Sequence, residues 1–391
     1  MIVTQLSLTD FRNYARAEVG FSGGPTLFVG SNGQGKTNLV EALGYLSTLG
    51  SHRVSTDHAM IRQGSDAAII RATLQAGERS LLAEVQINRV GANRAQVNRS
   101  AIRMRELPRY FSSVLFAPED LALVRGEPSG RRRFLDELLV LCSPRLAGVI
   151  ADYERILKQR NALLKSARVS GLRADGGGTL EIWDDKLVSL GSELIVARAD
   201  LIRDLLPEVR AAYLAVAGEE HHATMSSYLS VMQADPDSEA DNGVAGIGAV
   251  DAGSIDLGEV TQKFRDSLAR LRRRELERGI TLVGPHRDDL ILELNSLPAR
   301  GYASHGESWS FALSLKIASA MVLRRDSAVG DPVLILDDVF AELDESRRSR
   351  LAAAVSGFEQ VLITAAVLRD VPEKLAATTV HIEAGRIVDA P

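Results

Sequence analysis

The 391-residue sequence has one cysteine, Cys142, few aromatic residues and no long apolar run. A single cysteine excludes an internal disulfide framework and a four-cysteine zinc site, and it fits a reducing cytoplasm. No stretch approaches the roughly 20 apolar residues that cross a bilayer. The first residues, 1–8, lack the basic segment and apolar run of a signal peptide. We therefore expect a soluble, cytoplasmic protein without a membrane partner.

A large excess of either charge is also absent, because 46 basic and 51 acidic residues leave a formal net charge of −5. This balance argues against a polycationic coat on nucleic acid, but it allows a local basic groove. Apolar residues make up 45% of the chain, which is enough for a sizeable core. At this length we expect two domains, or one large domain with an insertion.

The periodicity of apolar residues divides the chain into three parts. Strand patterns occur near the N-terminus at 2–8, 26–29, 67–74, 81–87 and 114–116. They return near the C-terminus at 280–283, 332–336 and 360–364. The residues from 131 to about 216 instead follow a helical period. The pattern predicts an α/β domain built from both chain ends, residues 1–117 and 270–391, with a mainly helical insertion at 118–269.

Two segments of the insertion are rich in small and polar residues and have no large apolar face. They cover residues 171–179 and 234–258, and we expect both to be mobile loops. The insertion also lacks the sustained heptads of a coiled coil. A long coiled-coil arm is therefore excluded, and a compact helical lobe remains.

Residues 30–37 fit the phosphate-loop pattern G-x-x-x-x-G-K-[ST] at every required position. They lie between the predicted strand 26–29 and a helical pattern over 38–49, which is the context this motif needs. Backbone N–H groups of such a loop cradle the phosphates of ATP. The predicted phosphate-binding residues are Gly30, Ser31, Asn32, Gly33, Gln34, Gly35, Lys36 and Thr37. Lys36 would reach the β- and γ-phosphates, and the Thr37 hydroxyl would ligate Mg²⁺.

An apolar strand that ends in two carboxylates supplies the second half of the site. Residues 333–336 precede Asp337 and Asp338. Asp337 would hold Mg²⁺ through water, and Asp338 would polarise the water that attacks the phosphate. The alternatives are a chance loop match and a solvated carboxylate pair, and both weaken when one chain carries the two motifs. We therefore predict Lys36, Asp337 and Asp338 as the catalytic residues.

A third motif, Ser-His-Gly-Glu at 304–307, opens a helical pattern shortly before the acidic strand. It resembles the signature motif of ABC-type ATPases, which is specific in this order and spacing, although the turn alone is common. Ser304, the Gly306 N–H and Glu307 would bind the γ-phosphate of ATP held by a second protomer. Residues 341–344, Ala-Glu-Leu-Asp, resemble the D-loop that crosses such a dimer interface. ATP would then join two chains, and hydrolysis would release them.

Further blocks resemble the RecF family of bacterial DNA repair and replication ATPases over nearly the whole chain. They are Leu-Thr-Asp-Phe-Arg-Asn-Tyr at 8–14, Phe-Ala-Pro-Glu-Asp-Leu at 116–121, Arg-Arg-Arg-Phe-Leu-Asp at 131–136, the run 153–165 and Thr-Leu-Val-Gly-Pro-His-Arg-Asp-Asp at 281–289. By this resemblance, Arg12 and Asn13 would approach the nucleotide from the first strand, with Arg53 as a further candidate. One departure is His305, where many relatives have glutamine.

The resemblance implies an ABC-type ATPase head, the cofactors ATP and Mg²⁺, and slow DNA-stimulated hydrolysis without nuclease chemistry. It implies an ATP-gated homodimeric clamp on double-stranded or gapped DNA that serves replication, recombinational repair and the SOS response. RecF-like proteins work with RecO and RecR to load the recombinase RecA at gaps. Thr364 stands where transporters of the wider class have a switch histidine. A phosphate sensor without a titratable group fits slow hydrolysis.

Clustered arginines are candidates for DNA contact, because binding of the DNA backbone needs local positive charge rather than a basic protein. The predicted contacts are Arg94, Arg99, Arg103, Arg105, Arg131 and Arg132. The first four belong to a segment patterned like a β-hairpin and its exit. The alternative is a solvated basic face or, for the last two, a helix that packs on the head. No aromatic ladder is visible, which favours double-stranded over single-stranded DNA.

Two other functions remain open. An ABC transporter subunit would need a membrane-docking partner and a switch histidine, so Thr364 and the block at 284–289 argue against it. A nucleotide-gated scaffold that recruits proteins without hydrolysing ATP would share every motif. Only a turnover assay separates that scaffold from an ATPase.

Overall fold

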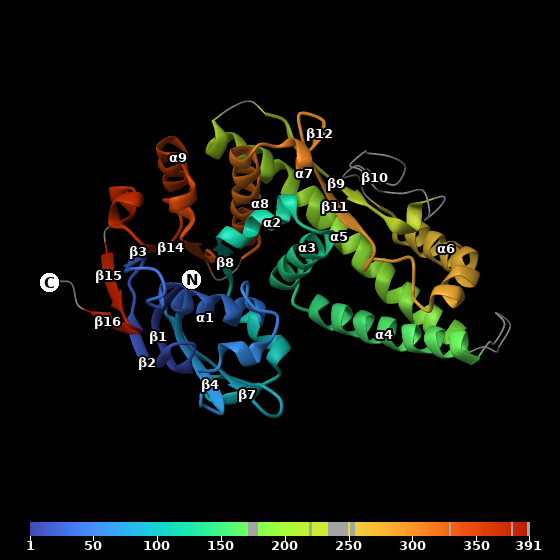
Figure 1. Cartoon of the computed structure of the whole chain (residues 1–391), viewed down its shortest axis with the longest axis horizontal. Helices are drawn as coiled ribbons and strands as arrows, with labels where there is room; N and C mark the ends of the chain where they lie inside the picture. The colour runs from blue at the N-terminus through green and yellow to red at the C-terminus, as the bar shows by residue number, and fades with distance from the viewer. Residues whose placement is uncertain are drawn as a thin grey trace. The chain divides into compact units, whose positions relative to one another are not determined.

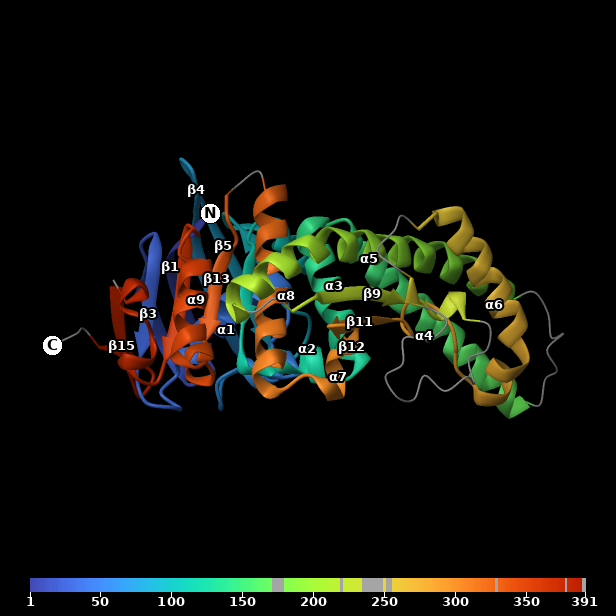
Figure 2. The same ribbon diagram turned by 90° about the horizontal axis from the view of Figure 1, so that it is seen from above.

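The computed structural model describes residues 1–170, 179–218, 221–233, 249–250, 255–327, 330–376 and 378–388. Figure 1 traces their elements, and Figure 2 shows the same elements from above. The chain divides into two compact units, which are described separately. The first comprises residues 1–121, 208–220 and 305–391, and the second comprises residues 122–207 and 221–304.

A mixed sheet of six strands forms one half of the first unit, in the order β16-β15-β3-β14-β13-β8. Its strands are Gly24–Val29 (β3), Ser113–Phe116 (β8), Val333–Asp337 (β13), Gln360–Ala365 (β14), Thr378–Glu383 (β15) and Arg386–Val388 (β16). All neighbours pair in parallel except β15 and β16. Strands β13 and β14 are buried along their whole length, as short apolar runs in a parallel sheet should be. The strands predicted at 26–29, 114–116, 332–336 and 360–364 are confirmed as β3, β8, β13 and β14.

An antiparallel sheet of order β2-β1-β4-β5-β6-β7 forms the other half of this unit. Its strands are Ile2–Phe11 (β1), Tyr14–Gly20 (β2), Ala67–Ala76 (β4), Arg79–Asn88 (β5), Arg94–Val97 (β6) and Ser100–Ile102 (β7). Buried and more exposed residues alternate along β4, so one face of the sheet contacts the core. The helices of the first unit are α1 (Lys36–Thr48), α8 (His305–Asp326), α9 (Glu345–Val355) and the end of α5 (Thr179–Ala217).

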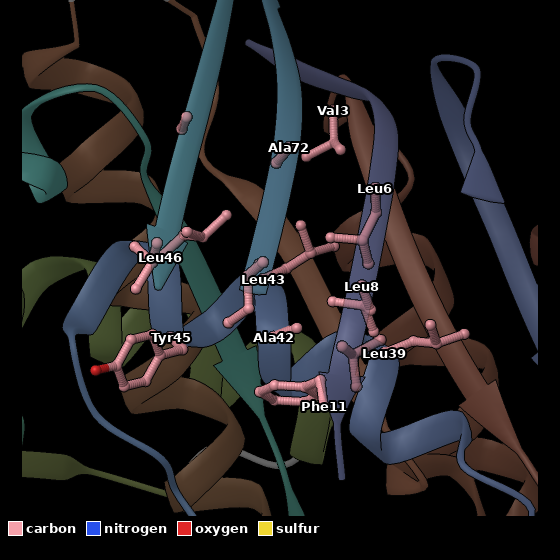
Figure 3. Close-up of a cluster of buried hydrophobic side chains, with 14 of the residues drawn as sticks. Val3, Leu6, Leu8, Phe11, Leu39, Ala42, Leu43, Tyr45, Leu46 and Ala72 are labelled. Carbon is pink, nitrogen blue, oxygen red and sulfur yellow. The ribbon is translucent and has the colours of Figure 1, made fainter. Parts of the chain in front are cut away.

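Helix α1 packs against both sheets and is buried on most sides. Figure 3 shows Leu39 and Leu43 of α1 beside Leu8 of β1. The same core cluster includes Ile335 and Leu362 of the mixed sheet. A helix that is apolar on nearly all sides must be enclosed in this way. The enclosure fixes the first turn of α1, which directly follows the phosphate-loop motif.

The second unit is mainly helical. Its helices are α3 (Pro128–Cys142), α4 (Leu146–Ser170), most of α5, α6 (Leu257–Arg278), α7 (Ala299–Tyr302) and most of α2 (Leu121–Arg125). A four-stranded sheet of order β10-β9-β11-β12 accompanies them. Its strands are Ala249–Val250 (β10), Ala223–Tyr228 (β9), Asp289–Leu294 (β11) and Leu297–Pro298 (β12). The sequence did not predict this sheet, because its strands are short and partly polar.

The observed units differ from the predicted domains in two places. Residues 270–304 were expected in the α/β head, but they belong to the second unit, because β11 pairs with β9. The end of α5 was expected in the insertion, but it belongs to the first unit, where Tyr213 packs against Phe311 of α8 at a ring separation of 5.9 Å.

The strand predicted at residues 280–283 is wrong, since these residues form an irregular turn. The backbone N–H of Thr281 donates to Asn161 Oδ1 (2.7 Å), and that of Leu282 donates to Glu275 Oε1 (2.8 Å). Side-chain oxygens thus accept hydrogen bonds from backbone N–H groups that would otherwise donate to a neighbouring strand.

The remaining elements are short 3-10 helices at Asp57–Met60, Met104–Arg109, Pro118–Asp120, Ser230–Met232, Val339–Glu342, Leu368–Asp370 and Glu373–Leu375. The predicted mobile loops at 171–179 and 234–258 lie mostly outside the described residues. Within the ranges that the structure describes, no helix has both the length and the apolar character to span a membrane.

A buried ion network holds three helices of the second unit together. The Arg160 side chain on α4 is fully buried and donates to Asp184 of α5 and to Glu275 of α6, both at 2.6 Å. A third donor reaches Thr281 Oγ1 at 2.8 Å. Burial raises the pKa of Glu275, and the charge of Arg160 opposes that rise. The guanidinium therefore offsets part of the cost of burying this carboxylate.

Replacing Arg160 by leucine should lower the free energy of unfolding by about 3–5 kcal/mol, because Glu275 would lose its buried partner. Urea unfolding followed by circular dichroism measures the change. The matched control is Arg273→Leu, which removes an exposed ion pair with Glu277 within α6 and should cost less than about 1 kcal/mol. Equal losses in the two variants would contradict the structural role of Arg160.

Candidate functional site

The phosphate-loop residues follow β3 and lead directly into α1. Two glycines adopt left-handed backbone conformations, Gly33 with φ 81° and Gly35 with φ 115°. Lys36 is the first residue of α1, and only 3% of it is exposed. Its Nζ donates to the carbonyl oxygens of Gly30 (2.8 Å) and Ser31 (3.3 Å). The ammonium group therefore lies inside the curve of the loop, where a phosphate-binding lysine is needed.

The turn between β1 and β2 supports the loop from one side. Asn13 Nδ2 donates to the Gln34 carbonyl oxygen, and the buried Tyr14 hydroxyl donates to the Gly35 carbonyl oxygen, both at 3.1 Å. A Cβ atom on Gly35 would lie 2.8 Å from each of these two side chains, so only glycine fits there. Asn13 was predicted near the nucleotide. Tyr14 was not predicted, because its buried position on β2 gave no separate signal.

The turn between β15 and β16 supports the loop from another side. The backbone N–H of Gly385 donates to the Gln34 carbonyl oxygen at 3.0 Å. The N–H of Ala384 donates to the Gln34 side chain. Any Cβ atom on Gly30 would collide with the carbonyl oxygen of Ile382. These contacts were not predictable, because they join residues more than 300 positions apart through backbone atoms.

The first carboxylate, Asp337, ends β13 and is 3% exposed. Its Oδ1 accepts hydrogen bonds from the Thr37 hydroxyl (2.9 Å) and from the Thr364 hydroxyl (2.6 Å). Its Oδ2 faces His52, whose Nε2 lies 3.7 Å away. The structure therefore brings together both predicted metal ligands, Thr37 and Asp337.

The second carboxylate, Asp338, has a left-handed backbone with φ 51° and ψ 20°. Its N–H donates to the hydroxyl of Thr364 at 3.0 Å. Burial raises the pKa of Asp338, while the positive charge of Lys36 lowers it and the charge of Asp337 raises it further. A carboxylate with a raised pKa is a better proton acceptor, which suits a group that activates water.

The donor set fits Mg²⁺. This ion prefers one or two protein oxygens and completes its shell with phosphates and waters. Thr37 and Asp337 supply such a pair. The Nε2 atom of His52 is buried, and no described residue provides it with a hydrogen-bond partner. A buried polar atom in this state beside Asp337 Oδ2 can take a further polar group bound at the site.

Arg12 differs from its predicted role. Its guanidinium forms two hydrogen bonds with Glu41 of α1, at 2.8 and 2.5 Å, and one with the Ala59 carbonyl oxygen at 2.8 Å. Arg53 lies 3.7 Å from the same carboxylate. These contacts fasten α1 to the loop before β4. Of the two residues predicted on the first strand, Asn13 contacts the phosphate loop, whereas Arg12 braces the helix that follows it.

The signature residues lie at the start of α8. Trp309 Nε1 donates to His305 Nε2 at 3.1 Å, so a side chain four residues further along the helix holds the unusual histidine. A Cβ atom on Gly306 would lie 2.8 Å from Nη1 of Arg347. The same guanidinium pairs with Asp344 of the D-loop at 2.6 Å. The signature turn and the D-loop are therefore neighbours within the first unit, a link that the sequence did not reveal.

The predicted DNA contacts separate into two groups. Arg94, Arg99, Arg103 and Arg105 are exposed, along β6, its turn and the following 3-10 helix. Arg131 is only 5% exposed, and its guanidinium bonds Asp289 twice (2.8 and 2.7 Å) as well as two carbonyl oxygens.

Arg132 donates to the Asp288 carbonyl oxygen at 2.7 Å, and burial lowers its pKa. Two of the six predictions therefore need correction. Arg131 is buried and uses four of its five N–H donors within the second unit, and Arg132 is partly committed there.

Comparison with known proteins places these features in a family. The RecF/RecN/SMC N-terminal domain family matches residues 2–383. The DNA replication and repair protein RecF of Clavibacter michiganensis subsp. michiganensis is 66% identical, over 100% of this chain and 96% of that protein. RecF of Leifsonia xyli subsp. xyli is 64% identical over 100% of both chains.

Solved structures of the recombination mediator protein RecF in the RecFOR pathway are similar to the whole chain. RecF-ATP is 25% identical with a TM-score of 0.85, over 100% of this chain and 97% of that chain. RecF-ATPrS is 25% identical with a TM-score of 0.84, over 99% and 97%. The predicted fold class is confirmed, with an ABC-type ATPase head formed from both chain ends. The chain belongs to the RecF family of DNA replication and repair proteins.

Proposed function

We propose that this chain is an ATP-dependent DNA-binding protein whose two copies close on DNA when ATP binds. The proposal depends on one observation: Lys36, Thr37 and Asp337 lie together at the phosphate loop, which neighbouring turns hold in place. A buried ammonium group inside the curve of a loop that leads into a helix N-terminus suits a polyphosphate. The relatives of known structure, described as complexes with ATP and ATPrS, support this ligand.

Each residue of the site would have a separate role in ATP hydrolysis. Lys36 would neutralise charge on the β- and γ-phosphates. Thr37 and Asp337 would hold Mg²⁺, which offsets phosphate charge when bound. Asp338 would orient a water molecule and accept its proton while the water attacks the γ-phosphorus and the bond to the ADP oxygen breaks. This chemistry transfers phosphoryl groups from ATP to water, and we expect it to be slow and stimulated by DNA.

A pocket of about 490 Å³ is lined by His58, Ile61 and Arg89 among others. Next to its lining residue Ile61, the Met60 carbonyl oxygen accepts from the backbone N–H of Arg12 at 2.7 Å. The size is typical of a small-molecule pocket. We propose that the nucleoside part of ATP extends toward it.

A second copy of the chain would complete the site. Ser304, the N–H of Gly306 and Glu307 would contact the γ-phosphate bound by the partner copy. Arg347 would transmit this contact to the D-loop, because it lies against Gly306 and pairs with Asp344. ATP would then hold the two heads together until hydrolysis removes the shared phosphate.

The exposed arginines of the β6–β7 edge would bind DNA phosphates. We propose that the closed dimer prefers double-stranded DNA next to gaps, and that it acts with RecO and RecR to load recombinase. The membership of the RecF family and the RecFOR pathway named for its structural relatives support this assignment. On this proposal the protein serves replication, recombinational repair and the SOS response.

Lys36→Met should abolish ATP binding and with it dimer formation, because the loop would lose its only buried cation among the described residues of 30–37. Sedimentation velocity with ATP, with and without gapped DNA, measures both effects. Wild type should dimerise on DNA only when ATP is present. Lys374→Met, a change at an exposed lysine, is the matched control. Dimers that form equally well with Lys36→Met would refute the ATP gate.

Asp338→Asn should keep ATP binding, lower the hydrolysis rate about 100- to 10,000-fold and trap the dimer on DNA. The amide keeps the size of the side chain but cannot accept the proton from water. Phosphate release and dissociation from labelled DNA report the two effects. The exposed Asp326→Asn serves as a control. Normal turnover together with a permanently monomeric protein would rule out the shared site.

Changing Arg99, Arg103 and Arg105 together to alanine should weaken binding to duplex DNA and reduce the salt dependence of that binding. Each lost phosphate contact should lower the slope of log affinity against log salt by about 1. Arg16→Ala is the control, since Arg16 is exposed on β2 at the opposite edge of the same sheet. An unchanged salt slope in the triple variant would exclude this edge as the DNA surface.

A further inference from the structure

Strand β14 lies between the strand that leads into the phosphate loop and the strand that carries the carboxylates. Its residue Thr364 pairs in register with Phe28 of β3 on one side and with Asp337 of β13 on the other. The side chain is fully buried. Thr364 therefore stands at the point where the two halves of the site meet.

The hydroxyl of Thr364 uses both of its hydrogen-bonding functions on the acidic pair. It donates to Asp337 Oδ1 at 2.6 Å and accepts from the N–H of Asp338 at 3.0 Å. A hydroxyl has a single hydrogen to donate, so this donor is committed to Asp337. The carbonyl oxygen of Thr364 also accepts from the Asp338 N–H, at 3.3 Å.

These contacts control the direction of each carboxylate. Thr37 and Thr364 together occupy Oδ1 of Asp337, which leaves Oδ2 to face His52, whose Nε2 lies 3.7 Å away. Asp338 has a left-handed backbone that a residue with a side chain rarely adopts, with φ 51°. The hydroxyl of Thr364 holds the N–H of that residue in place. A strained position persists only when its surroundings fix it in this way.

A buried threonine can also be a simple packing residue, and the neighbouring strand offers a direct comparison. Thr26 of β3 is equally buried, at 1% exposure, beside Leu362 of β14. Its hydroxyl has no hydrogen-bond partner among the described residues. The sheet therefore accommodates a threonine without using its hydroxyl, whereas the hydroxyl of Thr364 is fully used.

We propose that Thr364 is a positioning residue for hydrolysis, which aims Asp337 at the metal and sets Asp338 against the attacking water. This inference rests on the proposed function, since it assumes ATP and Mg²⁺ in the site. It assigns Thr364 a task different from sensing phosphate, because both of its contacts are to the carboxylate pair and not to the loop. Thr364 acts through the two aspartates and has no direct part in bond breaking.

The test compares Thr364→Val, which removes the hydroxyl at nearly constant shape, with Thr364→Ser, which keeps the hydroxyl and removes the methyl group. Thr26→Val is the matched control on the next strand. Thr364→Val should lower the turnover number about 10- to 100-fold with little change in ATP affinity. It should also raise the Mg²⁺ concentration needed for ATP to increase the melting temperature. Thr364→Ser and Thr26→Val should resemble wild type in all three measurements.

A packing role predicts the reverse order, with Thr364→Val active and Thr364→Ser impaired, and that result would overturn the proposal. Wild-type turnover and Mg²⁺ requirement in Thr364→Val would overturn it as well. If Thr364→Val does not fold, Thr364→Ala removes the same hydroxyl and is compared with Thr364→Ser in the same way. A wild-type protein that binds ATP without hydrolysing it would refute the proposed ATPase. The Mg²⁺ titration of the melting temperature would still decide the role of Thr364.

Discussion

Helix α1 packs its apolar side chains against both sheets of the first unit, so its first turn cannot move without opening the core. Burying a leucine contributes about 1.5–3 kcal/mol, and Leu39, Leu43 and Leu46 are all buried here. The Arg12–Glu41 pair fastens the same helix through a fully buried carboxylate. Because the phosphate loop leads directly into α1, the packing of α1 in the core also restricts the motion of the loop. A loop whose N–H groups are held in place needs little reorganisation when charge develops.

The second unit differs in that several of its charged side chains are buried in ion pairs instead of being exposed to solvent. Arg160 and Arg131 are both buried and paired with carboxylates, and Arg198 joins Asp136 at 2.8 Å. Such networks fix the packing of helices, although they add little net stability over apolar replacements. The exposed arginines of the β6–β7 edge belong to the first unit and show the opposite pattern. Arginine density along the sequence therefore did not distinguish exposed arginines from those that form internal ion pairs.

The motifs with a fixed residue spacing were predictable, because each depends on residues that are close together in the sequence. The phosphate loop, the helix after it and the strand ending in Asp337 all appear where the sequence placed them. The contacts of Tyr14, Thr364 and Gly385 were not predictable, because each depends on which distant strands become neighbours. The strand predicted at 280–283 is absent for a related reason. Its apolar residues look like a strand, but the side chains that satisfy its backbone come from α4 and α6.

The Gln34 carbonyl oxygen accepts from Asn13 near the beginning of the chain and from Gly385 near its end. During synthesis the loop therefore leaves the ribosome long before its last support exists. A nascent chain that stops short of residue 384 has the full loop sequence, but it lacks the β15–β16 turn. A chain shortened by eight residues from Pro391 would end at Glu383 and would lose this support. The order of translation thus delays a fully braced phosphate loop until the β15–β16 turn has been synthesised.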